Sequence, residues 1–96
     1  MKDIQEKDKI IAIITMFLPK AKIYLFGSYA RGEQRHYSDL DIAIDNGQPL
    51  PIALRGQIRS IIEALNTIQN VDLVDFRSVP KTLQEEIVRD GILWKE

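Results

Sequence analysis

The apolar residues of this chain recur in two kinds of pattern, one typical of helices and one typical of strands. Residues 4–18 carry apolar side chains three or four positions apart, as an amphipathic helix does, and Pro19 ends the pattern. Residues 39–45 instead alternate polar and apolar side chains, which is the period of a strand with one buried face. Applied to the whole chain, these rules predict helices over 4–18, 28–32, 52–68 and 80–90 and strands over 23–26, 39–45 and 71–76.

This order of elements predicts an α/β fold, with a small sheet of three or more strands and helices packed on one face. In the last helix, Leu83, Ile87 and Val88 are expected to face the sheet, and Gly91 to end the helix. The apolar tail 92–94 is expected to pack on the sheet or to cover one of its edges. With 96 residues the chain has room for one domain, 1–96, whose small core would gain stability from an oligomer or a partner chain.

Composition excludes several kinds of chemistry. The chain has no cysteine, which removes disulfides, thiolate zinc sites and thiol nucleophiles. Its net charge is −1 and it has no basic block, so strong direct binding to nucleic acid is not expected. The apolar run 10–18 is too short to cross a bilayer, and the acidic residues before it do not suit a signal peptide. We therefore expect a cytoplasmic protein with no membrane partner.

Two aspartates stand one residue apart inside the strand predicted over 39–45. Because neighbouring strand residues point to opposite faces, Asp39 and Asp41 share one face while the apolar residues fill the other. Two carboxylates on one face repel each other unless a divalent cation lies between them, and Mg²⁺ combines such ligands with water and substrate phosphate. The alternative, the solvated face of an edge strand, would more often mix Lys, Thr and Glu. The pattern therefore favours Asp39 and Asp41 as metal ligands.

A Gly27-Ser28 turn joins the strand predicted over 23–26 to the short helix after it. Glycine allows a sharp turn and a close ligand, and the start of a helix offers amide hydrogens to a phosphate. Taken alone, the pair is more typical of an ordinary turn in which Ser28 caps the helix. Beside two carboxylates, the phosphate-binding interpretation is favoured. Arg31 could then reach a phosphate oxygen, although a solvated arginine is an equal alternative.

A third carboxylate is expected on a neighbouring strand, where Asp72 and Asp75 are the candidates. They lie on opposite faces of the strand predicted over 71–76, so at most one of them can join the site. Alternation alone does not decide between them, and Asp75, near the strand end, could simply be solvated.

Gly27-Ser28, ten further residues and then Asp39-Leu40-Asp41 resemble the signature of the nucleotidyltransferase superfamily that includes DNA polymerase beta. The longer run Gly-Ser-Tyr-Ala-Arg-Gly, together with Ser-Asp-Leu-Asp-Ile-Ala-Ile, resembles its smallest branch, the minimal nucleotidyltransferases of bacteria and archaea. The stretch 71–75 is similar to that branch's third carboxylate strand, so the resemblance covers nearly the whole chain.

The resemblance implies a fold like the polymerase beta palm, with a mixed sheet, and a set of site residues. Asp39 and Asp41 would bind two magnesium ions, and Asp72, rather than Asp75, would be the third carboxylate. Gly27 and Ser28 would hold the terminal phosphates of ATP. The reaction implied is transfer of AMP from ATP to an acceptor hydroxyl, with release of pyrophosphate.

The resemblance also implies a partner. Minimal nucleotidyltransferases are one half of two-gene toxin–antitoxin systems, and the other half is an all-helical HEPN protein. This chain is thus expected to be an antitoxin that adenylylates a tyrosine hydroxyl of a HEPN-type toxin. Two alternatives stay open: an antitoxin that neutralises its partner by binding alone, and an enzyme that nucleotidylates a small molecule.

Overall fold

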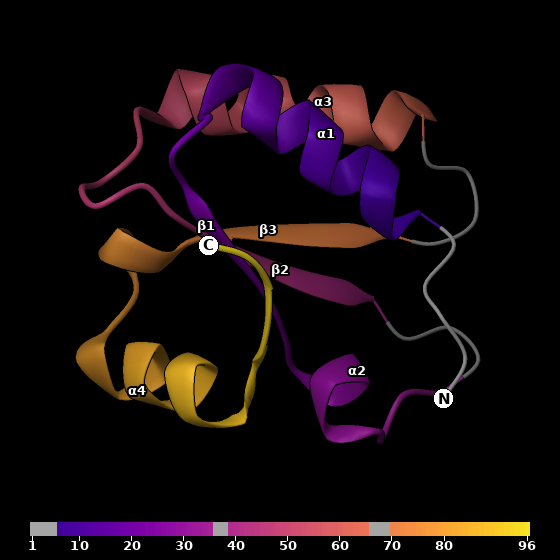
Figure 1. The fold of residues 1–96 in the computed structure, drawn as a ribbon, viewed down its shortest axis with the longest axis vertical. Coiled ribbons are helices and arrows are strands. Elements are labelled where there is room, and N and C mark those ends of the chain that lie inside the picture. The colour runs from indigo at the N-terminus through magenta and orange to yellow at the C-terminus, as the bar shows by residue number, and fades with distance from the viewer. Residues whose placement is uncertain (1–5, 36–38, 66–69) are drawn as a thin grey trace.

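The computed structural model describes residues 6–35, 39–65 and 70–96. These residues form a four-stranded sheet between helices (Figure 1). The elements, in chain order, are α1 (Lys7–Phe17), β1 (Lys22–Phe26), α2 (Ser28–Arg31), β2 (Leu40–Asp45), α3 (Ile52–Leu65), β3 (Val71–Asp75), the 3₁₀ helix η1 (Phe76–Ser78), α4 (Lys81–Asp90) and β4 (Ile92–Lys95).

The sheet is mixed and has the strand order β3-β2-β1-β4. β1 pairs antiparallel with β2 and with β4, whereas β2 and β3 run parallel. The parallel pair is possible because α3 crosses between the two strands and returns the chain to the same end of the sheet. The mixed α/β fold expected from the sequence is confirmed, and the apolar tail is an edge strand, β4.

The main core lies between the sheet and the two long helices α1 and α3, which Figure 1 shows together on one side of the strands. Strand alternation places Leu40, Ile42 and Ile44 of β2 on this side, and all three are fully buried. Isoleucines spaced at three or four positions bury the matching faces of both helices. The residues with no more than 1% exposure in this core are Ile10, Ile14, Ala21, Ile23, Leu25, Leu40, Ile42, Ile44, Ile58 and Ile62.

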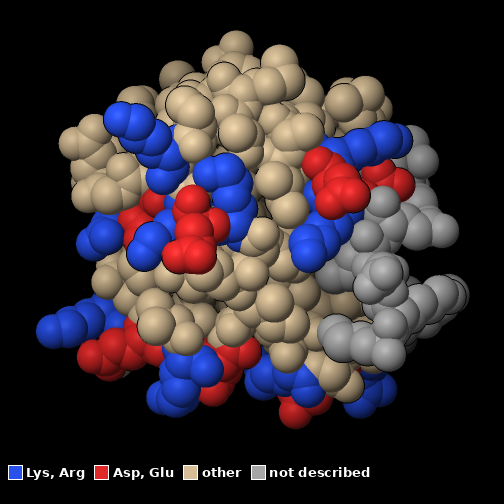
Figure 2. Space-filling model, viewed as in Figure 1, with Lys and Arg blue, Asp and Glu red and all other residues tan. Residues whose placement is uncertain are grey.

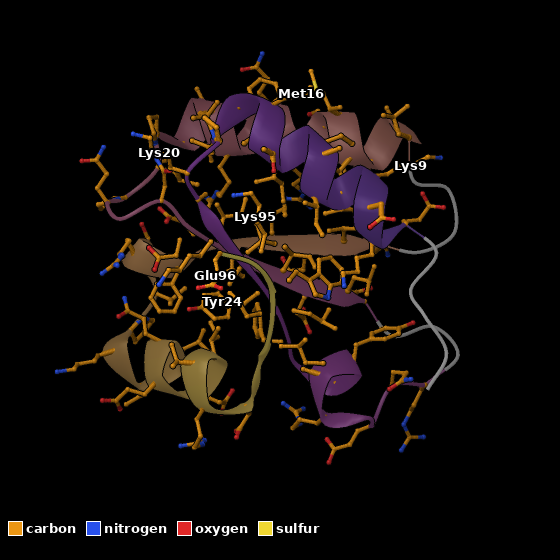
Figure 3. The ribbon with its side chains drawn as sticks, in the orientation of Figure 1. Lys9, Met16, Lys20, Tyr24, Lys95 and Glu96 are labelled. Atoms are coloured by element: carbon orange, nitrogen blue, oxygen red, sulfur yellow. The ribbon has the colours of Figure 1, made fainter. Side chains whose placement is uncertain are left out.

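The expectation that helices cover only one face of the sheet is wrong, because α4 packs on the opposite face (Figure 1). There Ile87 of α4 and Ala43 of β2 are fully buried. Tyr24 of β1 lies on the same side (Figure 3), and its ring stacks on Phe76 with centroids 5.8 Å apart. Val88, expected to face the sheet, is 58% exposed. Helical spacing alone did not show which of two neighbouring apolar residues points inward.

One face of the molecule carries charges of both signs. Figure 2 shows acidic and basic side chains intermingled over the described part of one face, without a block of one sign. An apolar side chain also reaches solvent: Met16 of α1 is 81% exposed and points away from the sheet (Figure 3). None of the helices within the described ranges is long and apolar enough to cross a membrane.

Candidate active site

Two carboxylates stand side by side where β2 and β3 begin. In the parallel pairing, Asp41 of β2 lies directly opposite Asp72 of β3, so both side chains project to the face on which α4 packs. Asp41 is half-buried and Asp72 is exposed. No hydrogen bond or ion pair to either carboxylate occurs among the described residues. The pair is therefore held together by the sheet and not by any mutual attraction.

Gly27 directly follows β1 and lies against the side chain of Asp41. Phe26, the last residue of β1, pairs with Asp41, and the chain turns at Gly27 with φ 75° and ψ −152°. This region of backbone space is open essentially only to glycine. A Cβ atom at Gly27 would overlap Oδ2 of Asp41 and lie 3.0 Å from its Cγ. Position 27 thus requires glycine for its conformation and for the approach of the carboxylate.

The surroundings of Asp41 disfavour its charged form. Burial raises the pKa of Asp41, and the negative charges of Asp72 and Asp39 raise it further. The positive charge of Arg31 acts in the opposite direction on the pKa of Asp41. A divalent cation beside Asp41 would remove the repulsion that the neighbouring carboxylates cause.

Asp39 is the third predicted ligand. It is exposed and lies one residue before β2, near enough for its charge to act on Asp41. Within 6–35, 39–65 and 70–96, no three His, Cys, Asp or Glu side chains lie close enough together to surround one ion. The assembled part of the candidate site is thus the Asp41–Asp72 pair, with Asp39 beside it.

The short helix α2 carries the two remaining candidates. Its N-cap is Gly27, so the alternative in which Ser28 caps the helix is wrong, and Ser28 is the first helical residue instead. Arg31, the last residue of α2, donates from Nε to Oε1 of Glu33 at 2.8 Å, and its side chain is 43% exposed. This hydrogen bond with Glu33 raises the pKa of Arg31. Arg31 therefore lies at the site as a cation that is already partnered by a carboxylate.

Asp75 has a different role from Asp72. It points to the other face of the sheet and is 2% exposed, so the suggestion that it is solvated is wrong. Its carboxylate accepts hydrogen bonds from Ser78 Oγ at 2.7 Å and from the backbone amides of Leu50 and Arg77 at 2.8 and 3.2 Å. These donors tie the loop before α3 to η1, and the structure thus places Asp72, and not Asp75, beside Asp41.

One charged pair beside this network was not foreseen from the sequence. Asp45, at the end of β2, accepts from Arg77 in a bidentate pair, with Nε–Oδ1 2.7 Å and NH2–Oδ2 3.2 Å. An aspartate at a strand end and an arginine 32 residues later give no local signal of pairing, because only the parallel register brings them together. His36, the one histidine of the sequence, lies outside the described residues.

Comparison with known proteins places the chain in a family. A model of the family described as "Polymerase beta, Nucleotidyltransferase" matches residues 8–96. The chain belongs to this family. The resemblance found in the Gly-Ser and Asp-Leu-Asp motifs is thus confirmed over nearly the whole sequence.

The family relatives include proteins with stated activities. The chain is 38% identical over 87 residues to the protein adenylyltransferase MntA of Shewanella oneidensis, and it spans 61% of the length of that relative. A crystal structure of a toxin–antitoxin with AMP-PNP matches with a TM-score of 0.75 at 36% identity, over 92% of this chain and 71% of that one. A structure of the tri-AMPylated Shewanella oneidensis HEPN toxin in complex with MNT antitoxin also contains a matching chain. Its TM-score is 0.72 at 31% identity, and the match covers 93% of this chain and 68% of that one.

Proposed function

We propose that this chain is an adenylyltransferase that moves AMP from ATP to a tyrosine hydroxyl of a HEPN-type toxin and thereby acts as its antitoxin. The observation that carries the proposal is the direct pairing of Asp41 with Asp72, with Gly27 held against Asp41. The similarity to MntA, and to a complex that contains an AMPylated HEPN toxin, supports the choice of nucleotide and acceptor. Because the reaction uses ATP, we also propose that the protein acts in the cytoplasm.

The donor set fits magnesium. Asp39, Asp41 and Asp72 offer only carboxylate oxygens, which Mg²⁺ prefers, and the glycine at position 27 leaves the Asp41 carboxylate the space that a side chain would fill. These three aspartates would hold two ions. When bound, the ions would supply positive charge for the entering and leaving oxygens and lower the pKa of the acceptor hydroxyl.

The other residues of the site would position ATP. The backbone of Gly27 and the hydroxyl of Ser28 would contact its terminal phosphates, and Arg31 would reach a phosphate oxygen by exchanging its exposed contact with Glu33. The acceptor oxygen forms a bond to the α-phosphorus of ATP while the bond from that phosphorus to the β-phosphate oxygen breaks. The hydroxyl proton passes to water, and pyrophosphate leaves with the bridging oxygen.

Mass spectrometry of the acceptor tests the proposal. A purified HEPN-type protein is incubated with the chain, magnesium and ATP. The expected result is a mass gain in units of AMP, located on a tyrosine by peptide mapping. The matched control is the Asp39→Asn, Asp41→Asn variant, which should bind the partner and lower the transfer rate by orders of magnitude.

The same experiment separates the remaining alternatives. A stable complex without any added AMP, with the toxin still neutralised, would overturn catalysis and leave an antitoxin that acts by binding. Transfer of AMP to a small alcohol in the absence of the partner, with none to the protein, would overturn the choice of acceptor.

A further inference from the structure

A groove runs along the outer edge of the sheet, next to the candidate active site. It has a volume of about 520 Å³ and lies between α3 and the edge strand β3. Arg55 and Arg59 of α3 line one side of it, and Asp72 and Leu73 of β3 line the other. We call this space the β3-edge groove. The groove thus places two arginines of α3 beside the strand that carries Asp72, a candidate catalytic carboxylate.

The two arginines of the groove are available to a ligand. Arg55 forms no ion pair or side-chain hydrogen bond with another residue in the described part of the chain. Arg59 contacts Glu63 one helical turn away, with Nε–Oε2 3.2 Å and both side chains more than half exposed. An exposed pair of this kind contributes little and exchanges easily for a better-placed carboxylate. The α3 side of the groove is therefore complementary to negative charge.

The strand beside these arginines has an open backbone edge. Among the described residues, β3 pairs only with β2. The amide of Leu40 donates to the carbonyl of Asn70 at 2.9 Å, which fixes the alternation of the parallel ladder. In that alternation, Asp72 and Val74 direct their backbone groups to β2, whereas Leu73 directs its amide and carbonyl outward. An extended peptide could thus pair with β3 as a fifth strand.

We propose that the β3-edge groove binds the segment of the partner protein that contains the modified hydroxyl, as an extended segment outside the helices of that partner, with acidic side chains on Arg55 and Arg59. This inference rests on the proposed function and adds where and how the acceptor binds. Neighbouring strands are about 4.8 Å apart, so a residue of the added strand beside Asp72 lies within reach of the reaction centre.

Strand alternation makes the inference specific. Asp72 projects to one face of the sheet, and the arginines of α3 lie on the other. Residues of an added strand point to these two faces in turn. The acidic residues of the acceptor must therefore stand one or three positions from the modified residue, and not two positions from it.

Steady-state kinetics of AMP transfer to the HEPN-type partner tests the groove. Charge reversal in the Arg55→Glu, Arg59→Glu variant is expected to raise the KM for the partner at least about tenfold while kcat changes less than about twofold. Arg89→Glu is the matched control, because Arg89 is an exposed arginine of α4 that lines a different hollow. Thermal unfolding checks the fold, and Arg55→Gln, Arg59→Gln should shift KM in the same direction by less.

A cross-linking experiment locates the segment directly. A photoreactive benzoylphenylalanine at Ile52, which lines the groove and is 80% exposed, should capture partner residues within a few positions of the modified tyrosine. The same group at Val88 on α4, which is 58% exposed, should not. Synthetic peptides that contain the tyrosine provide a second test. Replacing acidic residues one or three positions from the tyrosine by their amides should abolish AMP transfer to the peptide. The same replacement two positions from the tyrosine should leave AMP transfer unchanged.

The outcomes separate this inference from the proposed function. Absence of AMP on the partner with the wild-type chain would overturn the proposed function, and the inference with it. AMP transfer with the same KM in wild type and charge-reversal variant, or cross-links from position 52 far from the modified residue, would overturn the inference alone.

Discussion

Replacing Asp41 by asparagine is expected to stabilise the protein in the absence of metal. Burial and the charges of Asp72 and Asp39 raise the pKa of Asp41 above its ordinary value of 3.8. The folded state then holds this proton more tightly than the unfolded chain does. Ionising Asp41 therefore costs stability, which falls as the pH rises from the ordinary pKa through the folded pKa and stays lower above it. Asparagine keeps the size of the side chain and removes this cost.

The expected gain follows from the pairing of Asp41 with Asp72 on adjacent strands. Two unit charges about 4.8 Å apart repel by about 1 kcal/mol in water and by about 3.5 kcal/mol at an effective dielectric constant of 20. Asp72 is exposed and Asp41 only half-buried, so solvent screening favours the lower figure. For a domain of this size, about 1 kcal/mol corresponds to a rise in melting temperature of about 4–8 °C.

The assay is thermal unfolding followed by circular dichroism, first with EDTA and then with magnesium. With EDTA near neutral pH, Asp41→Asn should melt above wild type, and the difference should shrink as the pH falls toward the folded pKa of Asp41. Magnesium should raise the melting temperature of the wild type, because a ligand of the folded state stabilises it by mass action. The variant should lose this response.

A matched control and a clear refutation are available. Asp90 is an exposed carboxylate whose pKa is lowered by its hydrogen bond with Arg89, so Asp90→Asn should give no stabilisation. If Asp41→Asn melts below the wild type in EDTA, the carboxylate contributes favourable contacts, and the electrostatic argument fails. If the wild type does not respond to magnesium, the metal site is refuted.

Two further variants test the neighbours of this pair. Asp75→Asn should lower the free energy of unfolding in urea by about 1–3 kcal/mol. The carboxylate of Asp75 accepts hydrogen bonds from several donors, and an amide NH2 group in its place would face one of these donors with a donor of its own. Unchanged stability would contradict a structural role for Asp75. Gly27→Ala should cost about 1–3 kcal/mol from backbone strain alone and also displace Asp41, so both urea stability and AMP transfer should fall. An active, stable alanine variant would show that the turn relaxes.

Much of the fold could be predicted from the sequence because its elements carry strong local periods. All seven predicted helices and strands are present in the described ranges, although several end earlier than expected. The side of the sheet on which α4 packs could not be predicted, since an amphipathic helix shows that it has an apolar face and not which layer it covers. Pairing of the apolar tail with β1 is likewise a tertiary property.

The candidate site could be predicted in part for the same reason. A period of two is enough to put Asp39 and Asp41 on one face, and it also shows that Asp72 and Asp75 cannot both join them. The choice between the last two depends on the register of β3 against β2, which is set by the length of the α3 crossover and by the side of each strand that is buried. The register between β2 and β3 cannot be deduced from the local patterns of a single sequence.

The four aspartates of β2 and β3 show how the fold separates structural carboxylates from functional ones. At the carboxyl ends of these strands, Asp45 is paired with an arginine and Asp75 accepts three hydrogen bonds. At the opposite ends, Asp41 and Asp72 face each other without a donor among the described residues, and the pKa of Asp41 is raised. The carboxylates with donors hold loops in place, so removing one of them should lower the free energy of unfolding. The Asp41–Asp72 pair, which has no donors, lowers stability until a cation binds. This uncompensated repulsion between two carboxylates marks the site of the proposed chemistry.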